Sequence, residues 1–193
     1  MNAPEPRSAN RWIHWVVTVL VFVALYAWMT RGNVSPFIGK QAPALSLPVA
    51  AGNDAEERTR INLAEIDGVV VLEFWASWCG ACQRTTPILN DLHEQFRSEG
   101  VAFYAVNVEP IDRQRLQAAH AAFGTAFPSL HDRSGEVQRR YAIQSLPTIL
   151  VVGRDARVRW ASTGIPSKMR LRAAISEALD APGPGTVDGS VRR

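Results

Sequence analysis

Cys79 and Cys82 are the residues in this sequence whose type and spacing most clearly suggest chemistry. They are separated by Gly80-Ala81 and are the only cysteines among the 193 residues. Two thiols at this spacing can cycle between a dithiol and a disulfide, can supply half of a metal site, or can form a small structural disulfide. The surrounding sequence has to decide among these three roles.

The metal and structural roles receive little support from the rest of the chain. A zinc site needs two more ligands, yet the sequence has no second Cys-x-x-Cys, and His93, His120 and His131 show no short His-x-His spacing. A disulfide that closes so short a loop stabilises a fold only slightly. The sequence therefore favours a redox-active pair that needs no metal and no other cofactor.

The elements on either side of the pair are expected to place it at the start of a helix. Residues 69–75 are apolar and mostly β-branched or aromatic, interrupted only by Glu73, which predicts a buried strand. Residues 86–96 carry apolar side chains at helical spacing. Unpaired N–H groups and the helix dipole stabilise a thiolate at a helix N-terminus and lower its pKa. We therefore expect Cys79 to be the nucleophile and Cys82, one turn further on, to be the resolving cysteine.

The other segments predict an α/β fold. A turn at residues 153–156 should join the last two strands as a hairpin, and Pro166 should open the final helix. Strands that alternate with helices early and form a hairpin late imply a mixed central sheet flanked by helices. The further strands are expected at 101–108, 148–152 and 157–162, and the further helices at 113–123 and 166–179.

The N-terminal region reads as a membrane span. Residues 12–29 contain no Asp, Glu, Lys or Arg and are about as long as a helix that crosses a bilayer core. Aromatic residues stand at both ends of this segment, and Arg7 and Arg11 precede it, which predicts a cytoplasmic N-terminus. A cleaved signal peptide is the alternative, although a cut after Ala27 would place Leu25 where a small residue is preferred.

The chain is long enough for one ordinary domain with short extensions. Its net charge of +3 comes from scattered residues rather than from a basic block, so nucleic-acid binding is not expected. The expected organisation is a cytoplasmic N-terminus at 1–11, a transmembrane anchor at 12–29, a linker at 30–41, the folded domain at 42–180 and a disordered tail at 181–193.

Several segments of the sequence resemble motifs of a known family. Residues 73–82, EFWASWCGAC, are similar to the active-site segment of thioredoxin, and residues 145–148, SLPT, resemble the cis-proline loop of that fold. Residues 42–48 and 61–68 resemble the N-terminal hairpin and lead-in of the TlpA-like branch, which contains membrane-anchored periplasmic reductases, several of them serving cytochrome c maturation. The resemblance spans about residues 40 to 180. It implies a thioredoxin fold with an N-terminal hairpin extension behind a single N-terminal transmembrane helix.

The resemblance also implies roles for individual residues. Glu73 stands where thioredoxin has a buried acid, and a carboxylate inside an apolar strand should have a raised pKa and could accept the proton of the resolving cysteine. The alternative is that Glu73 lies at the edge of the sheet rather than in its interior. Pro147 would help keep metal away from the cysteines, and Leu146 would offer its backbone to a client strand. Trp78 would shield the nucleophile and contact the client, whereas Trp75 is expected in the core.

Together these features imply a protein-disulfide reductase in a bacterial inner membrane, with its catalytic domain in the periplasm. Its partners would be client proteins with thiols or disulfides and a membrane electron donor of the thiol-reductant transporter type. Gly80-Ala81 lacks the proline of thioredoxin and the histidine of strongly oxidising relatives, which favours a reductant. A disulfide oxidase or isomerase is the second hypothesis. A copper or haem chaperone that binds through the two thiols is the third.

Overall fold

The computed structural model describes residues 11–29, 35–52 and 59–183. The chain divides into two units, Met1–Asn33 and Val34–Arg193, which are described separately. The expected cytoplasmic segment up to residue 10, the linker up to residue 34 and the tail from residue 184 lie outside the described residues.

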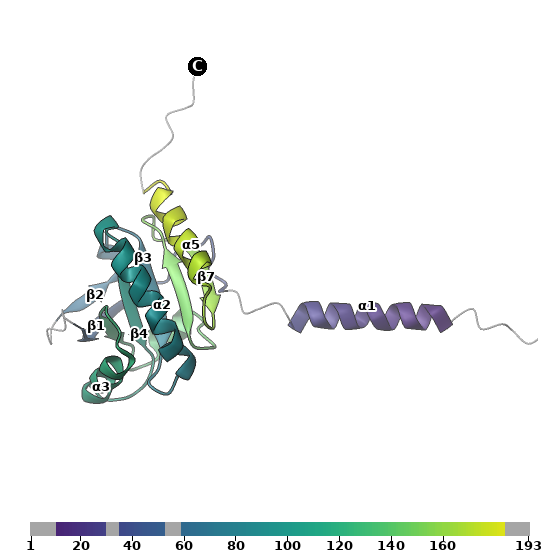
Figure 1. Cartoon of the computed structure of the whole chain (residues 1–193), viewed down its shortest axis with the longest axis horizontal. Helices are drawn as coiled ribbons and strands as arrows, with labels where there is room; N and C mark the ends of the chain where they lie inside the picture. Colours follow the sequence, from purple (N-terminus) through teal and green to yellow (C-terminus); the bar gives the residue numbers. More distant parts are fainter. Residues whose placement is uncertain (1–10, 30–34, 53–58, 184–193) are drawn as a thin grey trace, which may run out of the picture. The chain divides into compact units, whose positions relative to one another are not determined.

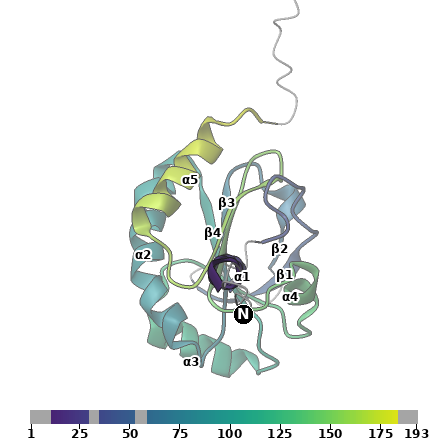
Figure 2. The same ribbon diagram turned by 90° about the vertical axis from the view of Figure 1, so that its right-hand side faces the viewer.

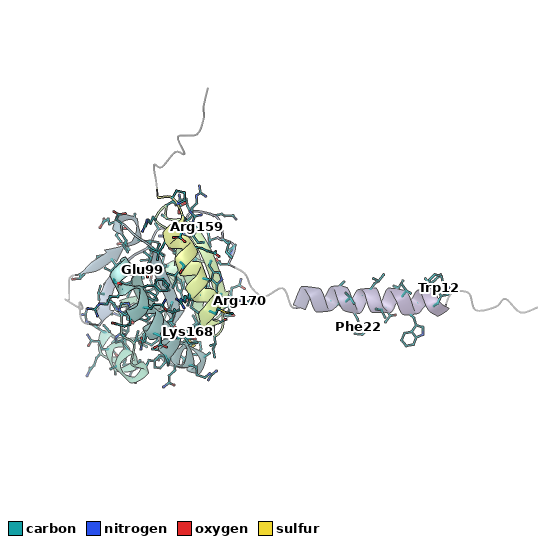
Figure 3. The ribbon with its side chains drawn as sticks, turned by 45° about the horizontal axis from the view of Figure 1, so that its top comes forward. Trp12, Phe22, Glu99, Arg159, Lys168 and Arg170 are labelled. Carbon is teal, nitrogen blue, oxygen red and sulfur yellow. A yellow bond between two sulfur atoms is a disulfide. The ribbon has the colours of Figure 1, made fainter. Side chains whose placement is uncertain are left out.

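The first unit contains helix α1 (Arg11–Met29). Its described side chains, at positions 12–25, are exposed and mostly apolar, and Trp12 and Phe22 project from it in Figure 3. Within the part of the chain that the structure describes, no helix has both the length and the apolar character that crossing a membrane requires.

The second unit is built on a mixed sheet. Among the described residues its strand order is β2-β1-β5-β4-β3-β6-β7. The central strand β3 runs parallel to β4 and antiparallel to β6, β4 is parallel to β5, and the β6–β7 and β1–β2 pairs are antiparallel hairpins. The bounds are β1 Ser46–Ala51, β2 Arg60–Asn62, β3 Val70–Trp75, β4 Ala102–Asn107, β5 Ser129–His131, β6 Thr148–Val152 and β7 Val158–Thr163. The mixed sheet that the sequence predicted is confirmed.

Helices cover both faces of this sheet. The long helices α2 (Gly80–Phe96) and α5 (Lys168–Asp180) lie side by side on one face, and an ion pair of 3.0 Å between Lys168 Nζ and Asp91 Oδ2 joins them (Figures 1 and 2). Helix α3 (Arg113–Phe123) contributes to the same layer, and the short α4 (Glu136–Arg140) packs against the opposite face. Single 3-10 turns occur at Leu63–Glu65 and Arg97–Glu99.

The alternation of side chains along β3 divides the core in two. Val71 and Trp75 point into the cluster formed with α2, α3 and α5, whereas Val70, Leu72 and Phe74 point into the cluster on the α4 side. Successive side chains of a strand point to opposite faces of the sheet, and β3 is buried along its whole length because both faces are covered. The fully buried strand that was expected at residues 69–75 is thereby explained.

The expected elements are present with small differences at their ends, and strand β5 and helix α4 were not anticipated. Helix α2 begins at Gly80 directly after its N-cap Cys79, which confirms the expected place of the cysteines at the start of a helix; the apolar spacing showed the helix only from residue 86, since its first turn carries few apolar residues. Helix α5 begins at Lys168, two residues after Pro166. Strand β5 and helix α4 are too short, at three and five residues, to produce a periodic signal.

Candidate active site

Cys79 and Cys82 form a disulfide at the junction between β3 and α2. Cys79 is the N-cap residue of α2, and its Sγ accepts a hydrogen bond of 3.1 Å from the backbone N–H of Cys82. A turn closed by a bond of 3.0 Å from the Cys79 N–H to the Ala76 carbonyl precedes the helix. One N–H of the first helical turn, that of Cys82, is thus directed at the sulfur of Cys79, which is the arrangement that stabilises a thiolate there.

Both cysteines are buried, but to different degrees. The Cys79 residue is 5% exposed, whereas Cys82 is fully buried in the cluster between the sheet and α2. Of the two, Cys79 is therefore the cysteine that keeps some contact with solvent. Among the described residues no group of three or more His, Cys, Asp or Glu side chains could hold a metal ion.

Glu73 lies in the interior of the sheet. It is 3% exposed on β3, between its neighbours Ala105 on β4 and Ile149 on β6, so the alternative position at a sheet edge is ruled out. As an odd-numbered residue it shares its face of the strand with Val71 and Trp75, the face that the CxxC helix covers. Its Oε1 has no hydrogen-bond partner among the described residues, and burial raises the pKa of Glu73 to about 8.

The SLPT segment forms a loop that precedes β6. The Leu146–Pro147 peptide bond is cis, the Pro147 carbonyl accepts from Gly164 N–H at 2.8 Å, and Thr148 Oγ1 donates to the Ser145 carbonyl at 2.7 Å. Pro147 is buried and Leu146 is half-buried, in contact with both hydrophobic clusters. The loop is therefore fixed from both ends.

The two tryptophans of the active-site segment occupy opposite environments. Trp75 is 2% exposed, with its ring centroid 5.2 Å from that of Phe123 on α3, which confirms its expected place in the core. Trp78, immediately before Cys79, is 73% exposed. A large exposed aromatic ring beside the cysteines is available to a partner protein.

Comparison with known proteins identifies the family. The model of the AhpC/TSA family matches residues 38–161. This chain belongs to the AhpC/TSA family. Thiol-disulfide oxidoreductase ResA of Geobacillus kaustophilus is 34% identical over 155 residues, 79% of this chain and 84% of the relative. The ResA of Geobacillus thermodenitrificans is 31% identical over 163 residues, 81% of this chain and 89% of the relative.

Solved structures agree with this assignment. A crystal structure described as a thiol:disulfide interchange protein DsbE from Chlorobium tepidum has a TM-score of 0.63 and 27% identity, covering 72% of this chain and 95% of that one. This AhpC/TSA-family chain has the thioredoxin fold and is a thiol-disulfide oxidoreductase.

The structure of this AhpC/TSA-family oxidoreductase also reveals residues around the pair that the sequence did not single out. The guanidinium of Arg84 lies over the CxxC turn, with Nη1 3.9 Å from the position that a Cβ on Gly80 would take. The carboxylate of Glu109, two residues beyond β4, accepts hydrogen bonds from both the N–H and the hydroxyl of Ser77. Polar residues just after a parallel strand commonly line functional sites, and this position after β4 was the available signal for Glu109.

Proposed function

We propose that this oxidoreductase is a membrane-anchored protein-disulfide reductase of the TlpA-like branch that acts through Cys79 and Cys82. The observation that carries the proposal is the unequal placement of the two cysteines: Cys79 is the N-cap residue of α2, with its Sγ accepting from the Cys82 N–H and 5% of the residue exposed, and Cys82 is fully buried one turn behind it. This arrangement supports one thiol that attacks and a second that resolves.

In the reduced enzyme the Cys79 thiolate attacks one sulfur of a client disulfide and displaces the other as a thiolate. A mixed disulfide between Cys79 and the client results. Cys82 then loses its proton and attacks the Cys79 sulfur, which releases the second client thiolate and forms the Cys79–Cys82 disulfide. Two electrons have passed to the client, and a dithiol donor must return two electrons to the enzyme.

Three further residues support these steps. Glu73, buried on the face of β3 that α2 covers, is the acceptor for the proton of Cys82, directly or through one water. Pro147 and Leu146 form the loop beside which an extended client segment would pair, with its apolar side chains against the exposed ring of Trp78. No cofactor is required beyond the cysteine pair itself.

The direction of electron flow follows from the residues between the cysteines. Gly80-Ala81 carries no histidine that would favour the thiolate and thus the reduced form. We expect a reduction potential below about −230 mV, nearer to that of thioredoxin than to those of oxidising relatives. Equilibration of the purified protein with a series of thiol buffers measures it. A potential above about −180 mV would instead indicate a disulfide oxidase or isomerase.

The redox titration does not test the third hypothesis, a copper or haem chaperone, which needs a separate measurement. A copper or haem chaperone would bind its cargo through the two thiols without turnover. Metal and haem analysis of the reduced protein after incubation with either cargo, together with a turnover assay on a protein disulfide, distinguishes that role. Turnover without stoichiometric cargo supports the reductase.

Residues 12–29 are proposed to anchor the protein in a bacterial inner membrane, with residues beyond 40 in the periplasm. The support comes from the eighteen residues without an ionisable acid, lysine or arginine, and from Arg7 and Arg11 ahead of them. The full chain should stay in the membrane pellet after an alkaline carbonate wash, while a variant lacking residues 1–33 should be extracted. If the full-length gene product were instead recovered in the soluble fraction as a shorter protein that begins near residue 28, the N-terminal segment would be a cleaved signal peptide.

The clients are proposed to be periplasmic proteins with disulfides, including those of cytochrome c maturation, and the donor a membrane thiol-reductant transporter. A Cys82→Ser variant stalls after the first attack and holds its client covalently. Isolation of these mixed disulfides from the native host and identification of the attached proteins tests the assignment. Failure to recover any haem-attachment protein or its partners would remove cytochrome c maturation from the proposal.

A further inference from the structure

A buried carboxylate outside the cysteine pair holds the loop that carries the nucleophile. Glu109 is 9% exposed, and its Oε2 accepts from the Ser77 N–H and, at 3.3 Å, from Asn107 Nδ2, while its Oε1 accepts from the Ser77 hydroxyl at 3.0 Å. The backbone of Glu109 is fixed as well: its N–H donates to Asn107 Oδ1 at 3.1 Å, and its carbonyl is 3.0 Å from His131 Nε2. A side chain held at so many points is a rigid support.

Ser77 is the residue through which the Glu109 carboxylate contacts the active-site loop. Strand β3 ends at Trp75 and α2 begins at Gly80, so residues 76–79 form the connection that places the nucleophile. Ser77 lies in the middle of this connection, directly before Trp78 and two residues before Cys79. Because Ser77 lies outside the sheet and the helix, its N–H has no partner in either, and it finds its acceptor in the Glu109 carboxylate.

We propose that Glu109 is a positioning residue for the reductase reaction, which acts through Ser77 to fix the presentation of Cys79 and Trp78 to a client disulfide. The inference rests on the proposed role of Cys79 as the attacking thiol. Attack on a disulfide requires the entering sulfur to meet its target in a defined direction, and displacement of a reacting group by about 1 Å can cost about a hundredfold in rate. The reach and the acceptor geometry of Glu109, rather than its charge, set this presentation.

Because each oxygen of Glu109 has its own donors, two conservative substitutions can separate the reach of the side chain from its charge. Both N–H donors fall on Oε2, and Oε1 faces a hydroxyl that can either donate or accept. A glutamine with its oxygen at the Oε2 position and its NH2 at the Oε1 position therefore keeps all three contacts without the charge. An aspartate keeps the charge but is one methylene too short to reach Ser77.

The experiment uses the full chain in detergent micelles, reduced, with a protein disulfide as substrate. We expect kcat/KM of Glu109→Gln to stay within about threefold of wild type and that of Glu109→Asp to fall about tenfold or more. The same changes at Glu94, an exposed residue of α2, are the matched control and should leave kcat/KM unchanged. Thermal melts establish that each variant is folded at the assay temperature.

Amide hydrogen exchange gives a second measurement that needs no client. In the wild type and in Glu109→Gln, the hydrogen-bonded amides of Ser77 and Cys79 should exchange slowly, and in Glu109→Asp they should exchange at least about tenfold faster. Wild-type kinetics and exchange in Glu109→Asp would overturn the proposal. So would a loss in Glu109→Gln equal to or larger than that in Glu109→Asp, because the charge would then be the property that matters. If the wild-type protein itself reduced no client, the proposed function would fail, while the exchange rates would still decide the role of Glu109.

Discussion

Glu73 allows a quantitative prediction about stability, because its carboxyl is buried without a partner at Oε1 and burial raises its pKa from 4.5 to about 8. Below pH 4.5 the folded and unfolded states both carry the proton. Between pH 4.5 and about 8 the folded state still binds a proton that the unfolded state has released. The free energy of unfolding therefore falls as pH rises through this window.

The size of the effect follows from the shift. A change of about 3.5 pKa units corresponds to about 5 kcal/mol, at about 1.4 kcal/mol per unit. Between pH 5 and pH 8, wild-type stability should thus decline by about 4 kcal/mol relative to a variant with no ionisable group at this position. Glu73→Gln is such a variant. Its amide is also buried, but the cost of burying an amide is the same at every pH.

The assay is urea unfolding of the oxidised protein at pH 5, 6, 7 and 8. Both hydrophobic clusters lie within residues 35–183, so a chain that begins at residue 34 contains the folded unit. The oxidised form is used because the two cysteines then do not titrate. Glu94→Gln, which removes an exposed carboxylate of α2, measures the effect of a changed net charge.

The quantity to compare is the difference in free energy of unfolding between Glu73→Gln and wild type. It should grow steadily in favour of the variant from pH 5 to pH 8. A difference that changes by less than about 1 kcal/mol over this range would show that the carboxyl has no strongly raised pKa. In single-turnover reduction of a client, the same variant should slow the resolving step and leave the first attack by Cys79 largely intact.

Three other substitutions test the site and its support. Cys79→Ser should abolish disulfide reduction, whereas Cys82→Ser should still attack and accumulate a covalent adduct visible on a non-reducing gel; preferential alkylation of Cys82 at pH 7 would contradict these roles. Trp78→Ala should lower kcat/KM for a protein disulfide about tenfold or more, with little effect on a small aromatic disulfide and a change in stability of less than about 0.5 kcal/mol, since the ring is 73% exposed. Leu89→Ala, at a fully buried position of α2, should cost about 2–5 kcal/mol in urea unfolding, and a cost below about 1 kcal/mol would contradict the tight packing of this helix on β3.

Much of the fold could be predicted because many of its strands and helices have an apolar pattern that is recognisable within the segment itself. The apolar run of residues 69–75, broken only by Glu73, predicted a strand covered on both faces, and β3 is such a strand with helices on either side of the sheet. The interval between β4 and β6 was harder, because β5 and α4 are short and gain their stability from neighbours rather than from their own sequence. The antiparallel pairing of β1 with β5 is of this kind, since it joins residues far apart in the chain.

The two carboxylates near the cysteines show why a site is harder to predict than a fold. Glu73 interrupts an apolar run, and that interruption alone draws attention to it. Glu109 follows a strand, between Val108 and Pro110, and looks like an ordinary loop residue until the fold brings it to Ser77, 32 positions earlier in the chain. The chemistry of each depends on its partners: Glu73 has no donor at Oε1, so burial opposes its charge, while Glu109 accepts from three donors and is held in place. The first is suited to exchange a proton with the buried Cys82, and the second is suited to stay fixed while Cys79 reacts.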